Sequence, residues 1–174
     1  KDVRLPIMIC QDGFITSHAV ENIELLEDAD VKNFVGEYEP EDYLLNPECP
    51  MAVGPYSITD YYMEAKRNQA EGTRNVSRVV KEVAEDFEKL SGRKYGLFEE
   101  YRMEDAERAV VIIGSAAGTT KDAVDRLREQ GEKVGLIKIR LFRPFPADEI
   151  AEALKNVKAI AIMDRAESYT NHGG

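Results

Sequence analysis

The chain has 174 residues, of which 43% are apolar and 32% charged, and its formal net charge at pH 7 is −10. This charge argues against non-specific nucleic-acid binding, since neutralising phosphates requires clustered Lys and Arg. No apolar run approaches the roughly 18 residues of a membrane span, which argues against a membrane protein. Cys10 and Cys49 match neither a disulfide framework nor a metal-binding motif, and no signal peptide is visible, so we expect a reducing, cytoplasmic setting.

The first third of the chain predicts a strand, a turn and a long connector. Residues 5–10 are apolar enough to need neighbouring strands on both sides. Because the chain lacks an initiator Met and enters this strand at once, we expect it to be the middle of a longer polypeptide whose upstream part supplies the sheet. Residues 36–57 contain several prolines and little periodicity, which predicts an extended connector over a surface.

Residues 60–90 are expected to form a long helix. Apolar residues recur at spacings of three and four over residues 76–90, which is the stripe of a helix with one packed face. The first half has a weaker stripe and contains Gly72, so two interpretations stay open: one continuous helix, or a helix that is broken there or packed against another subunit. Residues 95–103 then form a strand candidate whose charges alternate as on a half-exposed edge.

Residues 104–164 show alternating strand and helix patterns, and this stretch organises the rest of the chain. Continuous apolar runs predict strands at residues 109–113, 134–142 and 159–163, the first of them central in a sheet. Helices of about ten residues separate them, which implies right-handed crossovers and a parallel sheet with helices on its faces. The expected fold class is therefore α/β.

In such sheets, ligands and partners are met at the carboxyl ends of the strands. The residues expected there are Gly114, Ser115, Arg143, Asp164 and Arg165. The loop that starts at Gly114 lacks the motifs of dinucleotide and Walker sites, which favours a packing turn over a phosphate site. Arg143 is either a clamp for a carboxylate or phosphate or a salt-bridge partner. Asp164 and Arg165 form an internal pair or reach a ligand or another subunit.

The two histidines of the chain, His18 and His172, have no metal-ligand spacing to another His, Cys or carboxylate. Ser17 beside His18 would in principle suit nucleophile chemistry. Adjacent residues rarely present a base to a hydroxyl, however, so a helix-capping Ser next to a surface or interface His is favoured. Gln11 replaces the first Gly of a Gly-Asp-Gly metal motif, which favours an ordinary turn around Asp12.

Two groups of motifs resemble the α subunit of pyruvate:ferredoxin oxidoreductases. Residues 11–18 (QDGFITSH) and 30–36 (DVKNFVG) resemble the end of its first domain. Motifs similar to its second domain follow in the same order, at residues 92–95, 104–107, 114–119, 124–128, 133–135 and 142–146. Because these motifs cover nearly the whole chain in the right order, the chain is identified as a member of this family.

The resemblance implies a domain organisation. Residues 1–58 are expected to be the C-terminal remnant of the pyrimidine-binding thiamine diphosphate domain (domain I) with a connector, and residues 59–92 a long linking helix. Residues 93–174 are expected to be a truncated domain II. In the family, domain II is a three-layer α/β/α unit with a parallel or mixed sheet, similar to the C-terminal domain of transketolase.

The resemblance also implies an activity, the oxidative decarboxylation of pyruvate to acetyl-CoA with electrons passed through iron-sulfur clusters to ferredoxin. Thiamine diphosphate performs the chemistry, and coenzyme A accepts the acyl group. The cofactor, its Mg²⁺ and the clusters are expected to be held by upstream residues and by other subunits, with β, γ and δ subunits as partners. The alternatives are an α subunit for another 2-oxoacid, such as 2-oxoglutarate or a branched-chain substrate, and a non-catalytic nucleotide-sensing or assembly module.

This segment is then expected to be mainly scaffold and subunit interface, inactive alone, with neither a catalytic residue nor a metal ligand of its own. The residues expected nearest the cofactor cleft are Asp12, Gly13, Phe14, Thr16, Ser17 and His18. The interface candidates are Gly114, Ser115, Arg143, Asp164 and Arg165.

Overall fold

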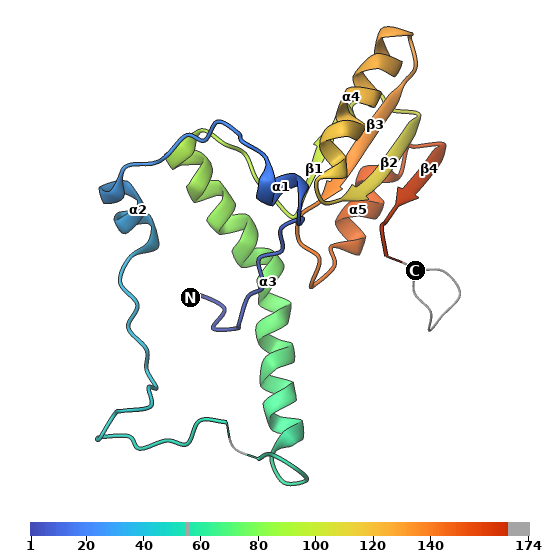
Figure 1. The fold of residues 1–174 in the computed structure, drawn as a ribbon. Coiled ribbons are helices and arrows are strands. Elements are labelled where there is room, and N and C mark those ends of the chain that lie inside the picture. Colours follow the sequence, from blue (N-terminus) through green and yellow to red (C-terminus); the bar gives the residue numbers. More distant parts are fainter. Residues whose placement is uncertain (55, 167–174) are drawn as a thin grey trace.

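A four-stranded mixed sheet forms the folded centre of the chain. The structure, a computed structural model, describes residues 1–54 and 56–166. The strands are β1 (Phe98–Tyr101), β2 (Arg108–Ile113), β3 (Val134–Ile139) and β4 (Ala159–Met163). Figure 1 shows this sheet beside a long helix, with the first third of the chain running around that helix.

The sheet has the order β1-β3-β2-β4. Strand β2 lies parallel to β3 on one side and to β4 on the other, while β1 is antiparallel to β3. Val110 of β2 faces Leu136 and Ala161 of its two neighbours. The predicted parallel pairing and the central place of β2 are therefore confirmed, and the edge strand β1 makes the sheet mixed.

Helices cover both faces of this sheet. Helix α4 (Ala116–Glu129) packs against Ile112 and Leu136, and helix α5 (Ala147–Leu154) packs against Val111 and Ile137 on the other side. Because successive residues of a strand point to opposite faces, the continuous apolar runs of β2 and β3 supply both cores. Leu136 and Ile137 are fully buried.

Two strands differ from the sequence expectation. Strand β3 ends at Ile139 rather than at residue 142, because the amides of Arg140 and Leu141 donate to the carbonyl of Leu97 at 3.0 and 2.7 Å. Strand β4 is apolar, yet all its residues are exposed, and Ile162 is 78% exposed. It pairs with β2 on one side only, so it forms an open edge of the sheet within the described residues.

The long helix α3 (Tyr62–Ser91) is continuous, so the break considered at Gly72 is wrong, while packing of its first half against another subunit stays a prediction. Its 30 residues correspond to about 45 Å. Gly72 does not break it. A Cβ atom there would lie 3.2 Å from the side chain of Leu5, so this glycine lets the N-terminal segment cross the helix closely. Gly92, in the left-handed conformation, ends the helix and donates its N–H to the carbonyl of Glu88.

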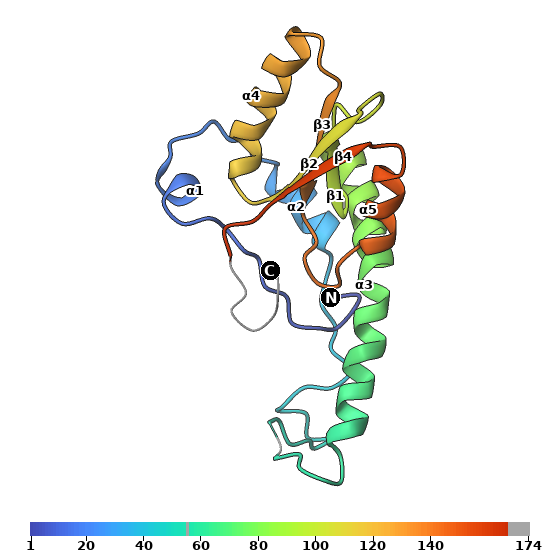
Figure 2. The same ribbon diagram turned by 90° about the vertical axis from the view of Figure 1, so that its right-hand side faces the viewer.

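The strand expected at residues 5–10 is wrong for this structure. The segment has no regular secondary structure, and Ile7, Met8 and Ile9 are between 82% and 91% exposed. The physical reason is that no strand among the described residues lies beside it to receive its backbone hydrogen bonds. Two short helices follow, α1 (Ile15–His18) and α2 (Asp28–Val35), and Figure 2 shows α1 near the first turn of α4.

The rest of the first third makes few contacts. Phe34 of α2 packs edge-on against Phe87 of α3, with ring centroids 5.7 Å apart. Between residues 36 and 57 the chain runs without a helix or strand in its described part, as expected for a connector. The domain boundaries expected at residues 58 and 92 fall just outside the two ends of α3, and they remain predictions.

Candidate functional site

The carboxyl ends of the parallel strands carry one contact between distant parts of the chain. The backbone N–H of Ser115, at the start of α4, donates a hydrogen bond to the carboxylate of Asp12, 103 residues away in sequence. Gly114, just before it, has a φ of +82°. A Cβ atom on this glycine would lie 2.9 Å from an Asp12 carboxylate oxygen, so the close approach requires a residue without a side chain.

Hydrogen bonds and positive charges around Asp12 stabilise the ionised form of its carboxyl group. Hydrogen bonds from the side chain and then the backbone N–H of Ser115 hold the pKa of the Asp12 carboxyl below its ordinary value, and Arg165 and Lys138 lower this pKa further. Lys138 belongs to β3 and Arg165 follows β4. The carboxylate therefore lies where three elements of the sheet domain contribute positive potential, including the N-terminus of α4.

The residues after Asp12 form a small, ordered loop. Phe14 has a φ of +70°, and its backbone N–H donates to the Ser17 hydroxyl at 2.9 Å. The same hydroxyl is 2.7 Å from Nδ1 of His18, whose ring stacks on Phe14 with centroids 5.3 Å apart. Ser17 thus caps the short helix, while Gly13 and Thr16 are exposed beside it.

The structure joins two groups of residues that the sequence analysis predicted separately. Asp12, from the loop expected near the cofactor cleft, contacts Gly114 and Ser115, from the expected interface group. Arg165, from the same expected interface group, lowers the pKa of Asp12 through its charge.

The remaining interface candidates do not join this contact. Asp164 accepts the backbone N–H of Ala166 at 3.1 Å. The internal pair of Asp164 with Arg165, and its alternative of a contact to a ligand or another subunit, stay predictions. Arg143 is exposed after β3, in the loop that leads to α5. His172 lies outside the described residues.

The loop of residues 11–18 has few of the side-chain contacts that catalysis requires. The Ser17 and His18 side chains touch each other, but the contacts of the described residues provide no carboxylate that orients the imidazole. In residues 1–54 and 56–166, no three His, Cys, Asp or Glu side chains gather to hold a metal ion. Cys10 and Cys49 are free and exposed. The same part of the chain contains no helix with the length and apolarity needed to cross a membrane.

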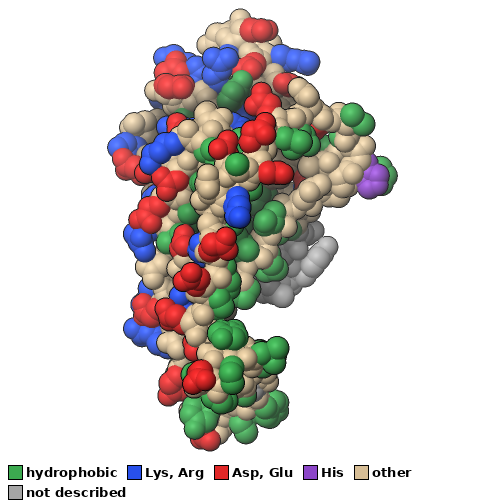
Figure 3. Space-filling model, turned by 90° about the vertical axis from the view of Figure 1, so that its left-hand side faces the viewer, with side chains coloured by type: hydrophobic (Ala, Val, Ile, Leu, Met, Phe, Trp, Pro, Cys, Tyr) green, Lys and Arg blue, Asp and Glu red, His purple; other side chains and the backbone are tan. Residues whose placement is uncertain are grey.

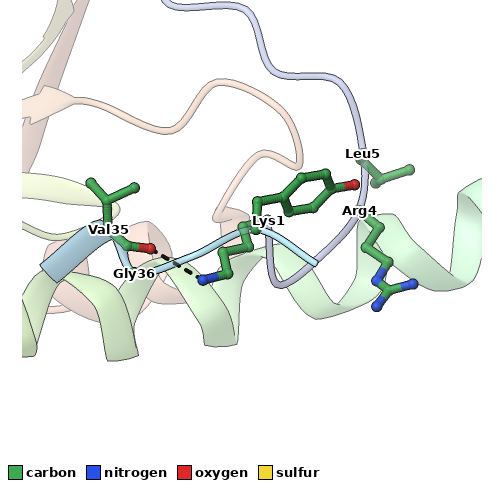
Figure 4. Close-up of a pocket in the computed structure, with 6 residues that line it drawn as sticks. Lys1, Arg4, Leu5, Val35 and Gly36 are labelled. Carbon is green, nitrogen blue, oxygen red and sulfur yellow. Dashed lines mark hydrogen bonds between the residues drawn. The ribbon is translucent and has the colours of Figure 1, made fainter. Parts of the chain in front are cut away.

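Two open hollows of the described residues lie away from this loop. One, of about 450 Å³, lies where the N-terminal segment meets the end of α2 (Figure 4), and there Lys1 Nζ donates to the carbonyl of Val35 at 3.2 Å. The other, of about 230 Å³, lies at the amino end of β2 beside Arg108 and Lys133. Both are open to solvent and neither has a cluster of groups suited to catalysis.

Exposed apolar side chains gather on the connector and the beginning of α3. Figure 3 shows them at the lower end of the molecule. Tyr56, Tyr61 and Met63 are 90%, 72% and 75% exposed. A surface of this kind is typical of a segment that packs against other protein in an assembly.

Sequence reasoning missed a charged network at the β1 edge. Glu99 of β1 pairs with Lys121 of α4 and, at 2.8 Å, with Arg140 after β3. Lys121 also lies over the ring of Tyr101. The only signal in the sequence was the alternation of charge along residues 99–102, which gave no indication of the partners.

Together, the fold and the Asp12–Ser115 contact define a mixed α/β unit whose strand ends meet the loop of residues 11–18 from earlier in the chain. Two family models match the chain in order. Residues 1–85 match the thiamine-diphosphate-binding model described as "Pyruvate flavodoxin/ferredoxin oxidoreductase, thiamine diP-bdg", and residues 106–174 match "Pyruvate:ferredoxin oxidoreductase core domain II".

Relatives agree with these matches. The chain is 50% identical over 169 residues to pyruvate synthase subunit PorA of Thermotoga maritima, a match that covers 97% of the chain and 43% of the relative. It is 39% identical over 176 residues to the α subunit of NADH-dependent phenylglyoxylate dehydrogenase of Aromatoleum evansii, covering 97% and 42%. The chain belongs to the pyruvate:ferredoxin oxidoreductase family and is a homologue of its α subunit, PorA.

The chain spans less than half the length of these curated relatives. Among solved structures, a 2-oxoglutarate:ferredoxin oxidoreductase from Magnetococcus marinus is similar with a TM-score of 0.45 and 21% sequence identity. That match covers 62% of this chain and 16% of the other.

Proposed function

We propose that the chain is part of the α subunit of a pyruvate:ferredoxin oxidoreductase. The whole enzyme would oxidise pyruvate and coenzyme A to acetyl-CoA and carbon dioxide, with the electrons passed to ferredoxin. The observation that carries this proposal is the pair of family models matched in order along one chain, supported by 50% identity to a pyruvate synthase subunit. The setting proposed for the enzyme is the cytoplasm.

Within this enzyme, the chain acts mainly as scaffold and subunit interface. Residues 1–58 are the C-terminal part of domain I with its connector, residues 59–92 the linking helix, and residues 93–174 a part of domain II. Helices on both faces of the parallel strands support a three-layer unit similar to the C-terminal domain of transketolase. The exposed apolar side chains of the first third support packing against the rest of the α subunit or its partners.

We infer that this chain does not hold thiamine diphosphate by itself. Its described residues contain no group of three metal ligands for Mg²⁺, and the Asp12 carboxylate is already engaged by Ser115. We therefore assign the diphosphate, Mg²⁺ and the iron-sulfur clusters to other parts of the α subunit and to the β, γ and δ subunits. What this chain supplies is the loop of residues 12–18, held at the strand ends of domain II.

The substrate follows from similarity rather than from a site in this chain. The highest identity quoted above is to a pyruvate synthase subunit, which favours pyruvate. The 39% identity to a phenylglyoxylate dehydrogenase subunit supports one second candidate, an enzyme for a larger 2-oxoacid. The two candidate substrates differ in the group attached to the keto carbon, and the second relative is also named as NADH-dependent.

The test is an assay of the assembled enzyme. A full-length α subunit that contains this chain is co-expressed with its partner subunits, and ferredoxin reduction is followed with pyruvate, 2-oxoglutarate, phenylglyoxylate or a branched-chain 2-oxoacid. We expect reduction to require thiamine diphosphate and coenzyme A and to have the highest kcat/KM with pyruvate. If the complex reduces ferredoxin only with another 2-oxoacid, that acid replaces pyruvate as the proposed substrate. If the complex oxidises none of the four, the enzyme assignment is refuted.

A second experiment tests the scaffold role. The chain alone is titrated with thiamine diphosphate, coenzyme A and nucleotides while its melting temperature is measured, since a ligand that binds the folded state raises it. We expect no shift with any of them and no decarboxylation of pyruvate. A shift with a nucleotide alone would instead support a non-catalytic sensing module, and tight binding of thiamine diphosphate would contradict the scaffold role.

A further inference from the structure

We propose that Asp12 is a positioning residue, whose contact with Ser115 latches the loop of residues 11–18 to domain II. The contact itself is independent of the enzyme assignment. Its role in catalysis rests on the proposed function, in which this loop lies near the cofactor cleft. The latch would fix the distance and orientation of the loop relative to the sheet domain.

Asp12 is where this part of the chain meets the rest of the molecule. Between residues 6 and 25, every residue is exposed except Asp12, which is half-buried. The neighbouring apolar side chains do not anchor the segment, since Ile9 and Phe14 are 89% and 81% exposed. Among the described residues, the hydrogen bond from Ser115 to Asp12 is therefore the polar contact that joins this loop to the sheet domain.

The other side of the contact is shaped for a carboxylate. Ser115 is the N-cap residue of α4, at the end of the helix where backbone N–H groups lack partners within the helix. Gly114 leaves room for the Asp12 carboxylate and has a backbone conformation that favours glycine. Lys138 and Arg165 add positive charge from β3 and from the end of β4.

This arrangement also explains a loop that the sequence left ambiguous. The turn between β2 and α4 has the position of a phosphate-binding loop but not its glycine spacing. In the structure the place open to an anion is filled from within the chain, by the Asp12 carboxylate. The turn is thus a socket for domain I rather than a site for a free phosphate.

The test is peptide-resolved hydrogen exchange on the full α subunit in its assembled complex. Asp12→Ala removes the acceptor, and Glu21→Ala removes an exposed acid from the same segment as a matched control. We expect exchange at residues 11–18 and 114–116 to rise at least fivefold in Asp12→Ala and less than twofold in Glu21→Ala. Asp12→Asn keeps an oxygen acceptor, so its exchange should lie between those of Asp12→Ala and the unaltered protein.

A second pair of variants addresses the donor. Ser115→Pro removes the backbone N–H at a residue whose φ of −68° a proline can adopt, whereas Ser115→Ala removes only the hydroxyl. We expect the larger rise in exchange in Ser115→Pro. Unchanged exchange in both Asp12→Ala and Ser115→Pro would overturn the latch.

The catalytic consequence is measured separately, as the kcat of the complex with pyruvate and its KM for coenzyme A. In Asp12→Ala we expect kcat to fall about tenfold while KM for coenzyme A stays within twofold, with partial recovery in Asp12→Asn. Raised exchange with unchanged kcat would overturn the positioning role. If the unaltered complex oxidises no 2-oxoacid, the enzyme assignment fails, yet the exchange data still decide whether the latch exists.

Discussion

Two apolar segments of similar length have opposite fates in this molecule. Residues 109–113 form most of β2, which lies between two parallel strands and under helices on both faces. Residues 5–10 are just as apolar but form no strand, and the side chains of Ile7, Met8 and Ile9 lie in solvent. The difference shows that apolarity alone does not make a strand, because its backbone groups also need neighbouring strands as hydrogen-bond partners.

The same contrast holds for the two halves of the chain. Every buried apolar side chain among the described residues lies between Leu97 and Ile150. The first 58 residues contribute none, although they are rich in Ile, Leu, Val and Tyr. The buried core of the described residues therefore lies in the sheet domain, and the first third adds no side chain to it. Matched substitutions in the two regions test this difference.

The largest effect is expected from a pair of Leu→Ala substitutions. Leu136 of β3 is fully buried between Ile112 and Val124, whereas Leu25 is 88% exposed. Leu136→Ala should lower the free energy of unfolding by about 2–5 kcal/mol, through lost burial and the cavity left behind. Leu25→Ala should change it by less than about 0.5 kcal/mol. Urea denaturation of both variants checks this, and equal losses would contradict the contrast.

A pair of glycine substitutions gives the next largest effect. A Cβ atom at Gly135 would lie 2.5 Å from the sulfur of Met103 and 2.8 Å from the carbonyl oxygen of Arg102. Gly135→Ala should therefore destabilise the sheet by about 1–3 kcal/mol through overpacking. At Gly118 in α4, nothing lies within 4 Å, so Gly118→Ala should stabilise by up to about 1 kcal/mol. Opposite signs in thermal melts are the expected result.

A smaller loss is expected from the charged network at the β1 edge. Glu99 is 24% exposed and meets the charges of both Lys121 and Arg140, so Glu99→Gln leaves two cations less compensated. We expect a loss of about 1–2 kcal/mol by urea denaturation. Glu82→Gln on α3 is the control, because its exposed pair with Arg78 should contribute less than about 0.5 kcal/mol. A larger loss in the control would contradict this assignment.

The same carboxylates set the expected response to acid. Burial raises the pKa of Glu99, but its hydrogen bond and charge pairing with Lys121 and Arg140 lower it more, so the net pKa lies below the ordinary value. The pKa of Asp125 is lowered by its hydrogen bond from Tyr101. A carboxylate whose pKa is lower in the folded state than in the unfolded state stabilises the fold. This stabilisation is fully present at pH values above the pKa of the unfolded state, which is near 4.5 for Glu and 3.8 for Asp.

The stabilisation from these two groups should therefore be lost as pH falls through their folded-state pKa values. Denaturation at a series of pH values should show the free energy of unfolding constant from about pH 7 to 5 and falling below pH 4.5. Glu99→Gln should flatten the fall. A free energy that rises as the pH drops from 5 to 3 would have the wrong sign for this account.

Much of the sheet domain was predictable from sequence, because its elements follow from local patterns. The apolar runs of β2 and β4, the turn at Gly114 and the acidic first turn of α5 each mark an element independently. The end of β3 was not predictable, since it depends on where the Leu97 carbonyl lies. The Asp12–Ser115 contact was also not predictable from the sequence, because it joins residues 103 positions apart and no local pattern indicates it.

The most direct test of the central claim is hydrogen exchange of residues 5–10, measured in the isolated chain and in a full α subunit within its complex. Strands β2 and β3 serve as the internal standard and should exchange slowly in both. We predict that residues 5–10 exchange at near-unfolded rates in the isolated chain and at least tenfold more slowly in the complex. Slow exchange of residues 5–10 in the isolated chain, comparable to that of β2, would contradict the account.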